Sequence, residues 1–416
     1  MNSKALAAAI PKKGKFRRAF PFLGPAFLVS VGYIDPGNWA TNIEGGATFG
    51  YTLLWVLLLS NLMAILLQIT AAKLGVATGK SLAENCRQHF SKPVAVFLWI
   101  TAELAAMATD LAEFLGAALG IYILLGIPLF PAALIGAAVT FGILLLHKYG
   151  YRFIEQVILA FVLVVAAVYI LELFYAKPDF AQVGYHMVVP QLNSASILVA
   201  IGMLGATVMP HNIFLHSSVV KNRLKKDQPK HNHRVYKFAI VDSLLALNIA
   251  WFINSAMIIV AAAVFFKNGV SVKSIEDAYS TLTPLLGGFA SLAFAIALLS
   301  AGLSSSVTGT MAGQYILEGF LNVKLPIWVR RVVTMIPALI IIGMGIDTWK
   351  ALVVSQVVLS MQLPFTIIPL ILFTRNKKIM GKYANRPLTN VLLCIVATLI
   401  IFLNALLIYQ TFGGNF

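Results

Sequence analysis

The chain has 416 residues, of which 59% are hydrophobic and only 11% charged, and its formal net charge is +16. This composition excludes a soluble globular protein, and it excludes a β-barrel, whose strands alternate in polarity and span only about 10 residues. Crossing a bilayer as a helix takes about 20 apolar residues. Six stretches without Asp, Glu, Lys or Arg are long enough for this: 51–72, 118–146, 187–220, 278–317, 351–374 and 387–416. We therefore expect an all-α polytopic membrane protein.

Residues 1–19 carry six Lys or Arg and show no cleavage site after a short apolar core, so we expect a cytosolic tail rather than a removed signal. Eleven membrane spans are expected after it, at roughly 20–46, 51–73, 93–118, 121–146, 153–174, 193–219, 237–265, 284–316, 331–346, 349–374 and 389–412. The tail and the loops on its side of the membrane hold 27 of the 31 Lys and Arg. This asymmetry predicts a cytoplasmic N-terminus and an extracellular C-terminus. The positive charge is then an orientation signal with affinity for anionic lipid, and no nucleic-acid partner is expected.

The first span is interrupted in its middle by the run Asp35, Pro36, Gly37 and Asn38. A simple proline kink is common in membrane helices. A kink alone, however, explains neither the carboxylate nor the amide beside it. An unwound helix frees carbonyl oxygens that lipid cannot satisfy, and a bound cation can satisfy them.

The third span carries three acids, Glu103, Asp110 and Glu113, whose offsets place them within an arc of roughly 80° on one helix face. Acids inside a membrane usually mark an ion or proton path. The alternative is a structural set, paired with arginines or helix ends. The seventh span contains a further acid, Asp242, for which the sequence suggests no role.

The sixth span reads GMLGATVMPHNIFLHSS and is interrupted near Met209 and Pro210. Interrupted spans five apart predict two five-helix halves of opposite orientation, with a binding site at the membrane midplane. We expect a core at 20–374, with repeats at about 20–174 and 193–374, and an additional helix at 389–412.

The two interruptions together offer a carboxylate from Asp35, an amide oxygen from Asn38, a backbone carbonyl near Ala206 and a thioether from Met209. Hard cations such as Mg²⁺ and Ca²⁺ gain nothing from sulfur, whereas transition metals do. The set predicts a site for Mn²⁺, Fe²⁺, Co²⁺, Zn²⁺ or Cd²⁺. Met209 as a flexible packing residue remains the alternative.

His211 and His216 also lie in the sixth span, about 140° apart, so they do not form a two-histidine metal face. His211 is next to Met209 and suits a proton relay. For His216 the relay and an ordinary core histidine stay open. Because the motif H-E-x-x-H is absent, we expect no metalloenzyme. An amino-acid symporter of the same architecture is the remaining alternative, but an acid at the site would repel a carboxylate substrate.

Several segments resemble the Nramp divalent metal transporters, specifically the bacterial manganese branch. They are PFLGPAFLVSVGYIDPGNWATNIEGGA, MATDLAEFLGAALG, GATVMPHNIFLHSS, TLTPLLG, ALLSAGLSSSVTGTMAG and VSQVVLS, and the resemblance covers residues 20 to 412. It implies the LeuT fold and inward transport of divalent metal with protons in a bacterial plasma membrane. Metal ions and protons are then the substrates, and no cofactor is expected. The sequence does not determine the oligomeric state, and a monomer is compatible with it.

Position by position, the resemblance implies Asp35, Asn38, Met209 and the Ala206 carbonyl as metal ligands, with Gln356 as a further ligand in closed states. It also implies an arginine at the start of span nine, Arg331 or its neighbour Arg330, paired with acids of span three. A proton path would run from Asp35 through Asp110 and Glu113 toward the cytoplasm.

Overall fold

The computed structural model describes residues 25–145, 151–226 and 228–412. The predicted tail at 1–19 and the first residues of the predicted first span, 20–24, lie outside them. Throughout the described part of the chain the regular structure is helical, which confirms the all-α prediction.

In chain order the elements are α3 (Pro25–Ser30), the 3-10 turn η1 (Val31–Ile34), α4 (Pro36–Phe49), α5 (Leu54–Thr78), α6 (Leu82–His89), α7 (Lys92–Leu125), α8 (Leu129–Leu145), α9 (Tyr151–Ala176), α10 (Phe180–Val188), α11 (Ile197–Val208), α12 (Pro210–Lys221), α13 (Pro229–Val264), η3 (Phe266–Asn268), α14 (Ile275–Leu286), α15 (Gly288–Leu321), α16 (Ile327–Gly343), α17 (Thr348–Arg375), α18 (Lys377–Met380), η4 (Gly381–Tyr383) and α19 (Pro387–Thr411).

Each predicted span corresponds to one helix or to one interrupted pair of helices. Among the described residues, eight helical segments are long and apolar enough to cross a membrane, with α11 and α12 counted together. The chain is therefore a multi-pass membrane protein. The helices α8 and α16 and the separate pieces of the first span, α3 and α4, are each shorter, so the count of eleven crossings stays a prediction.

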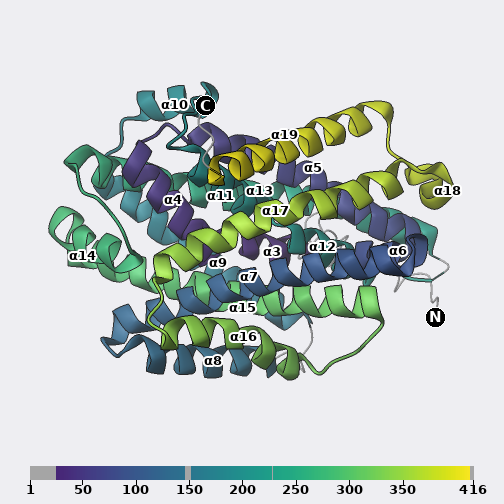
Figure 1. The fold of residues 1–416 in the computed structure, drawn as a ribbon, viewed down its shortest axis with the longest axis horizontal. Helices are drawn as coiled ribbons and strands as arrows, with labels where there is room; N and C mark the ends of the chain where they lie inside the picture. The colour runs from purple at the N-terminus through teal and green to yellow at the C-terminus, as the bar shows by residue number, and fades with distance from the viewer. Residues whose placement is uncertain (1–24, 146–150, 227, 413–416) are drawn as a thin grey trace, which may run out of the picture.

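Four short helices between the spans were not predicted. In Figure 1, α6 and α18 lie at one end of the bundle, whereas α10 and α14 lie at the other. This is the arrangement expected when successive spans alternate in direction. Several helices begin some residues away from the rough predicted ends: α8 begins at Leu129, α13 at Pro229 and α15 at Gly288. Helix α16 begins at Ile327, so Arg330 and Arg331 lie inside its first turns.

Helix α6 is bonded to the C-terminal half of α12 on the predicted cytoplasmic side. The Lys221 ammonium lies 2.7 Å from a Glu84 oxygen, and the Leu82 N–H donates to the Ser217 hydroxyl at 3.0 Å. Burial raises the pKa of Glu84, but hydrogen bonds from Lys221 and Ser81 and the charge of Lys221 outweigh it and hold the pKa below its usual value. The second half of the interrupted sixth span is thus tied to the loop between spans two and three.

The acid without an expected role, Asp242, stabilises the start of the first interrupted span. One of its carboxylate oxygens accepts a hydrogen bond of 2.7 Å from the backbone N–H of Ala26, at the N-terminus of α3. Helix N-termini carry unsatisfied N–H groups and a partial positive charge, which a carboxylate satisfies. Asp242 therefore joins α13 to α3.

Helices α7 and α15 run closely side by side, and glycines permit α7 to approach the break in the first span. A Cβ at Gly116 would lie 1.9 Å from Cγ of Pro36, and one at Gly120 would lie 2.8 Å from Cα of Leu299. The proline ring at the start of α4 is therefore seated directly on α7.

We expect Gly116→Ala to lower the free energy of unfolding by about 1–3 kcal/mol, the usual cost of overpacking. The reason is that neither the proline ring nor the helix backbone can yield without moving the break. Thermal unfolding in detergent measures the effect. Gly142→Ala is the matched control, because a Cβ there meets nothing within 4 Å. Equal melting temperatures for the two alanine variants would contradict this packing.

Candidate metal site

The first break is a capped helix start. Asp35 is the N-cap of α4 and has extended backbone (φ −65°, ψ 163°). Its Oδ1 accepts hydrogen bonds from the backbone N–H of Asn38 at 2.9 Å and from Asn38 Nδ2 at 2.7 Å. Asp followed by Pro at the first helical position is a favoured helix start. The run that looked anomalous for a membrane span thus ends one helix and begins another.

The second break is sharper and consists of a single residue. Met209 ends α11 and begins α12 with φ 41° and ψ 97°, a left-handed conformation that is unusual outside glycine. Pro210 follows as the first residue of α12. Such backbone strain typically costs about 1–3 kcal/mol and collects at functional sites.

The two breaks meet. Asn38 Nδ2 also donates to the carbonyl oxygen of Ala206, in the last turn of α11, at 3.0 Å. Gln356 of α17 lies against both broken spans, since a Cβ at Gly37 would be 1.8 Å from Gln356 Nε2 and one at Gly205 would be 2.3 Å from the Gln356 carbonyl. Asp35, Asn38, Ala206 and Gln356 therefore come together, and Met209 lies three residues after Ala206 in the chain.

This meeting point is sealed and holds acceptor atoms without donors. Asp35, Asn38, Met209 and Gln356 are each 0% exposed. Asp35 Oδ2, Asn38 Oδ1 and Gln356 Oε1 are all buried and have no hydrogen-bond partner among the described residues. Leaving such groups unsatisfied is costly, and each needs an explanation. A cation bound among them would satisfy all three.

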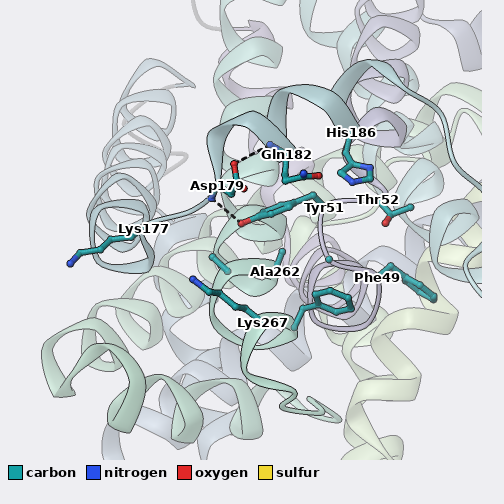
Figure 2. A pocket seen from close by; sticks show the side chains of 12 residues that line it. Phe49, Tyr51, Thr52, Lys177, Asp179, Gln182, His186, Ala262 and Lys267 are labelled. Carbon is teal, nitrogen blue, oxygen red and sulfur yellow. Dashed lines mark hydrogen bonds between the residues drawn. The ribbon is translucent and has the colours of Figure 1, made fainter.

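The described residues contain no cluster of three or more His, Cys, Asp or Glu that could hold a metal. A cavity of about 430 Å³ does open at the predicted outer end, between α4, α10 and α13. Its only acid is Asp179, which caps α10 and whose backbone N–H donates to the Tyr51 hydroxyl at 3.3 Å (Figure 2). Lys177 and Lys267 also border the cavity, and Lys177 points away from it (Figure 2). The oxygen atoms at the two breaks therefore suit a cation better than the lining of this cavity does.

The acids of α7 face helices α15 and α16 rather than lipid. Arg331 Nη1 lies 3.4 Å from Asp110 Oδ1, with both side chains fully buried. Arg330 Nη1 lies 2.7 Å from Glu103 Oε1, in a pair that is slightly more exposed. The pairing of span-nine arginines with span-three acids is therefore present in the structure.

Glu113 is the unpaired member of the three. It is completely buried, and within residues 25–145, 151–226 and 228–412 no donor reaches either of its oxygens. Asp110, three residues earlier on α7, pairs with Arg331, and Gly116, three residues later, packs on Pro36, so Glu113 lies between the buried ion pair and the first break. Its carboxylate packs on Gly309 of α15, where a Cβ would lie 2.2 Å from Oε2.

Small residues of α15 make room for these charged groups. A Cβ at Gly313 would lie 1.8 Å from Arg330 Nη2. Arg331 Nη2 donates to the Ser306 hydroxyl at 3.1 Å, and its guanidinium lies 5.8 Å from the centre of the Phe114 ring. The polar run in span eight thus supplies hydrogen bonds and space for buried arginines.

The two histidines have different partners. His211 Nδ1 is 3.1 Å from the Thr109 hydroxyl, which places the ring against α7 next to Asp110, and its Nε2 is buried without a partner. His216 Nδ1 is 2.9 Å from Gln68 Oε1, and Gln68 Nε2 is 2.6 Å from the Tyr33 hydroxyl. His211 therefore lies between the metal site and the acids, whereas His216 belongs to a network with α5 and η1.

Sequence reasoning missed several polar residues around the breaks. Asn254 of α13 donates to the Tyr33 carbonyl of η1 at 2.5 Å and accepts from Asn42 of α4 at 2.6 Å, so it bridges the two sides of the first break. Thr109 and Gln68 orient the histidines. Asn and Gln residues inside apolar spans were the signal that the sequence offered. Their spacing, however, does not show which of these side chains contact one another.

Known proteins resemble this chain over almost its whole length. The family model described as natural resistance-associated macrophage protein-like, Nramp, matches residues 26–410. The chain belongs to the Nramp family. The divalent metal cation transporter MntH of Caldanaerobacter subterraneus subsp. tengcongensis is 52% identical over 402 residues, which cover 96% of each chain.

Solved structures extend the Nramp assignment to the fold. The crystal structure of the Eremococcus coleocola manganese transporter, in complex with an aromatic bis-isothiourea substituted compound, superposes with a TM-score of 0.87 at 33% identity. The match covers 98% of this chain and 90% of that one. Mhp1, a nucleobase-cation-symport-1 family transporter, is only 16% identical with a TM-score of 0.55, covering 84% of this chain and 77% of its own. That likeness bears on the fold alone, and it supports the LeuT-like architecture predicted for this Nramp chain.

Proposed function

We propose that this protein imports divalent transition-metal ions, Mn²⁺ foremost, together with protons across a bacterial plasma membrane. The metal would bind between the two breaks and reach each side of the membrane in turn. Fe²⁺, Co²⁺, Zn²⁺ and Cd²⁺ share the required chemistry and are expected as further substrates. The names of the MntH relative and of the Eremococcus manganese transporter support this substrate class.

One observation supports the proposal most strongly: buried acceptor atoms of α4, with its N-cap, and of α17 lack donors in the described part of the chain where these helices meet α11. Asp35 Oδ2, Asn38 Oδ1 and Gln356 Oε1 are buried and unpartnered at the meeting of α4, α11 and α17. Burying three oxygens without donors is costly, and a cation bound among them would remove that cost. The Ala206 carbonyl and the Met209 sulfur complete the proposed ligand set.

The membrane potential favours the proposed direction of transport. A charge of +2 that moves inward across −100 mV gains about 4.6 kcal/mol, and a proton that moves with it adds about 2.3 kcal/mol. We propose that the proton leaves Asp35 through Glu113 and Asp110 toward Arg331, with His211 alongside and Glu103 nearer the cytoplasmic end. This route is separate from the metal's own exit.

Glu113→Gln should uncouple proton movement from metal uptake. The exchange keeps the size of the side chain but removes its ability to carry a proton and the charge of its ionised form, and a proton-transfer group typically contributes about 100-fold. In proteoliposomes we expect Mn²⁺ uptake to persist while the acidification of the lumen per Mn²⁺ falls about tenfold or more.

Glu172→Gln in α9 is the matched control, because Glu172 is also buried in a span with both oxygens unpartnered. It lies on another helix and should leave the proton-to-metal ratio unchanged. A normal ratio in Glu113→Gln, or an equal loss in both variants, would contradict a specific route along α7.

Uptake of radioactive Mn²⁺ into proteoliposomes, with a mixture of amino acids as competitor, tests the proposed function against the organic-substrate alternative. We expect Mn²⁺ to accumulate and Cd²⁺ to compete, while the amino acids have no effect. Inhibition by the amino acids, or uptake of an amino acid in place of Mn²⁺, would favour a symporter of the Mhp1-like architecture with a different substrate.

A further inference from the structure

The two breaks share a four-residue pattern. The first reads Asp35-Pro36-Gly37-Asn38 and the second Met209-Pro210-His211-Asn212. In both, a proposed ligand is the N-cap, proline is the first helical residue, and asparagine comes three positions after the ligand. Asn212 thus occupies in the second half the place that Asn38 occupies in the first.

The two asparagines also make the same contact. Asn38 Nδ2 donates to Asp35 Oδ1 at 2.7 Å, and Asn212 Nδ2 donates to Met209 Sδ at 3.3 Å. A thioether sulfur can only accept a hydrogen bond, so the amide nitrogen is the end that faces it. In both residues the remaining amide oxygen is buried and lacks a partner in the part of the chain that the structure describes.

The Asn212 side chain is tightly packed between the two broken spans. Its side chain is completely buried, and a Cβ at Gly32 in η1 would lie 2.4 Å from its Nδ2 and 3.2 Å from its Oδ1. The amide therefore packs against the unwound part of the first span, η1, and donates a hydrogen bond to Met209, the proposed ligand in the second broken span.

We propose that Asn212 is a positioning residue that fixes the Met209 thioether for the metal, an inference that rests on the proposed function. Methionine has three rotatable side-chain bonds and is the most adaptable of the apolar residues. One N–H to the sulfur occupies one lone pair, selects one rotamer and leaves the second lone pair for the ion. The side chain then meets the ion already ordered, so less conformational entropy is lost on binding.

The inference separates soft from hard cations. Only ions that gain from sulfur lose affinity when the thioether is free to rotate. We expect Asn212→Leu, which keeps the volume but not the donor, to lower the ratio of Cd²⁺ affinity to Ca²⁺ affinity by about tenfold. Asn212→Ala, which adds no atoms, should act in the same direction and provides the test if the leucine variant does not fold.

Titration calorimetry of the purified protein with Cd²⁺, Mn²⁺ and Ca²⁺ provides the measurement. Ser218→Ala is the matched control, since Ser218 is buried on the same helix and its hydroxyl bonds only to the Phe214 carbonyl in the described contacts. It should leave the affinity ratio unchanged. A ratio within about twofold of the wild type in Asn212→Ala would overturn the inference.

A double-mutant cycle distinguishes positioning from general packing. If Asn212 acts through the sulfur, Asn212→Leu changes the ratio by less than about twofold once Met209 is already leucine. If the effects of the Asn212 and Met209 substitutions on the ratio of Cd²⁺ affinity to Ca²⁺ affinity multiply independently, the inference is overturned. Wild-type protein that binds no divalent metal would instead refute the proposed function, so the two failures are distinguishable.

Discussion

Asp35→Ala will abolish metal uptake. Asp35 is the only charged residue among the five proposed ligands, and its partners Asn38 and Gln356 are neutral amides. A divalent ion that has lost its hydration would face neutral groups alone in a fully buried site. Removing one partner of a buried charge pair costs about 3–5 kcal/mol. That cost corresponds to more than about 100-fold in binding, measured as Mn²⁺ uptake and as calorimetric affinity.

Asp35→Asn refines the result, because an amide oxygen can still accept the hydrogen bond that caps α4. We expect folded protein with equally little uptake, which assigns the loss to the charge rather than to the cap. Asp347→Asn is the control: Asp347 also caps a helix, by accepting from the Lys350 N–H at 3.2 Å, but it is exposed. If Asp35→Ala takes up Mn²⁺ at a rate within a few-fold of the wild type, Asp35 is not a metal ligand.

Met209→Ala will weaken the exclusion of Ca²⁺ and Mg²⁺ more than it weakens Mn²⁺ transport. The thioether adds nothing to the binding of hard cations, so its loss leaves a ligand set of oxygens alone, which hard cations accept. We expect the preference for Cd²⁺ over Ca²⁺ to fall by about 10- to 100-fold. Competition of each ion against radioactive Mn²⁺ uptake measures it.

Met209→Leu separates the sulfur from the shape of the side chain, because it restores the volume without the thioether. We expect leucine to lose selectivity as alanine does. The wild-type preference retained in Met209→Leu would show that Met209 only fills space between α11 and α12.

The sequence predicted the spans and both breaks, for a physical reason. Lipid supplies no hydrogen bonds, so a proline, an acid or an amide inside an apolar run must serve a local purpose. Asp35, Pro36 and Asn38 do so within four residues, which is why the first break could be predicted without the fold. Met209 was harder, since methionine is as common in packing as in binding.

Contacts between residues far apart in the chain were harder to predict from the sequence. Three acids within one arc of α7 predicted a common direction but not the partners, and resemblance to a family, rather than spacing, suggested an arginine. The role of Asp242 depends on where the start of α3 lies, 216 residues away in the chain. The glycines at 309 and 313 that make room for Glu113 and Arg330 likewise have meaning only once α15 lies against α7 and α16.

Asn212 shows the same limit at close range. The repeated pattern of ligand, proline and asparagine is visible in the printed sequence, yet its significance depends on the direction of two amide side chains. Only the contacts to Asp35 Oδ1 and Met209 Sδ reveal that the halves match.

Anomalous scattering from a crystal soaked in Mn²⁺ is the most direct measurement of where the ion binds. We predict one strong peak enclosed by Asp35, Asn38, the Ala206 carbonyl and Met209, with the chain unwound on both sides of it. A peak elsewhere, for instance in the outer cavity near Asp179, or continuous helices through residues 35 and 209, would contradict the proposed site.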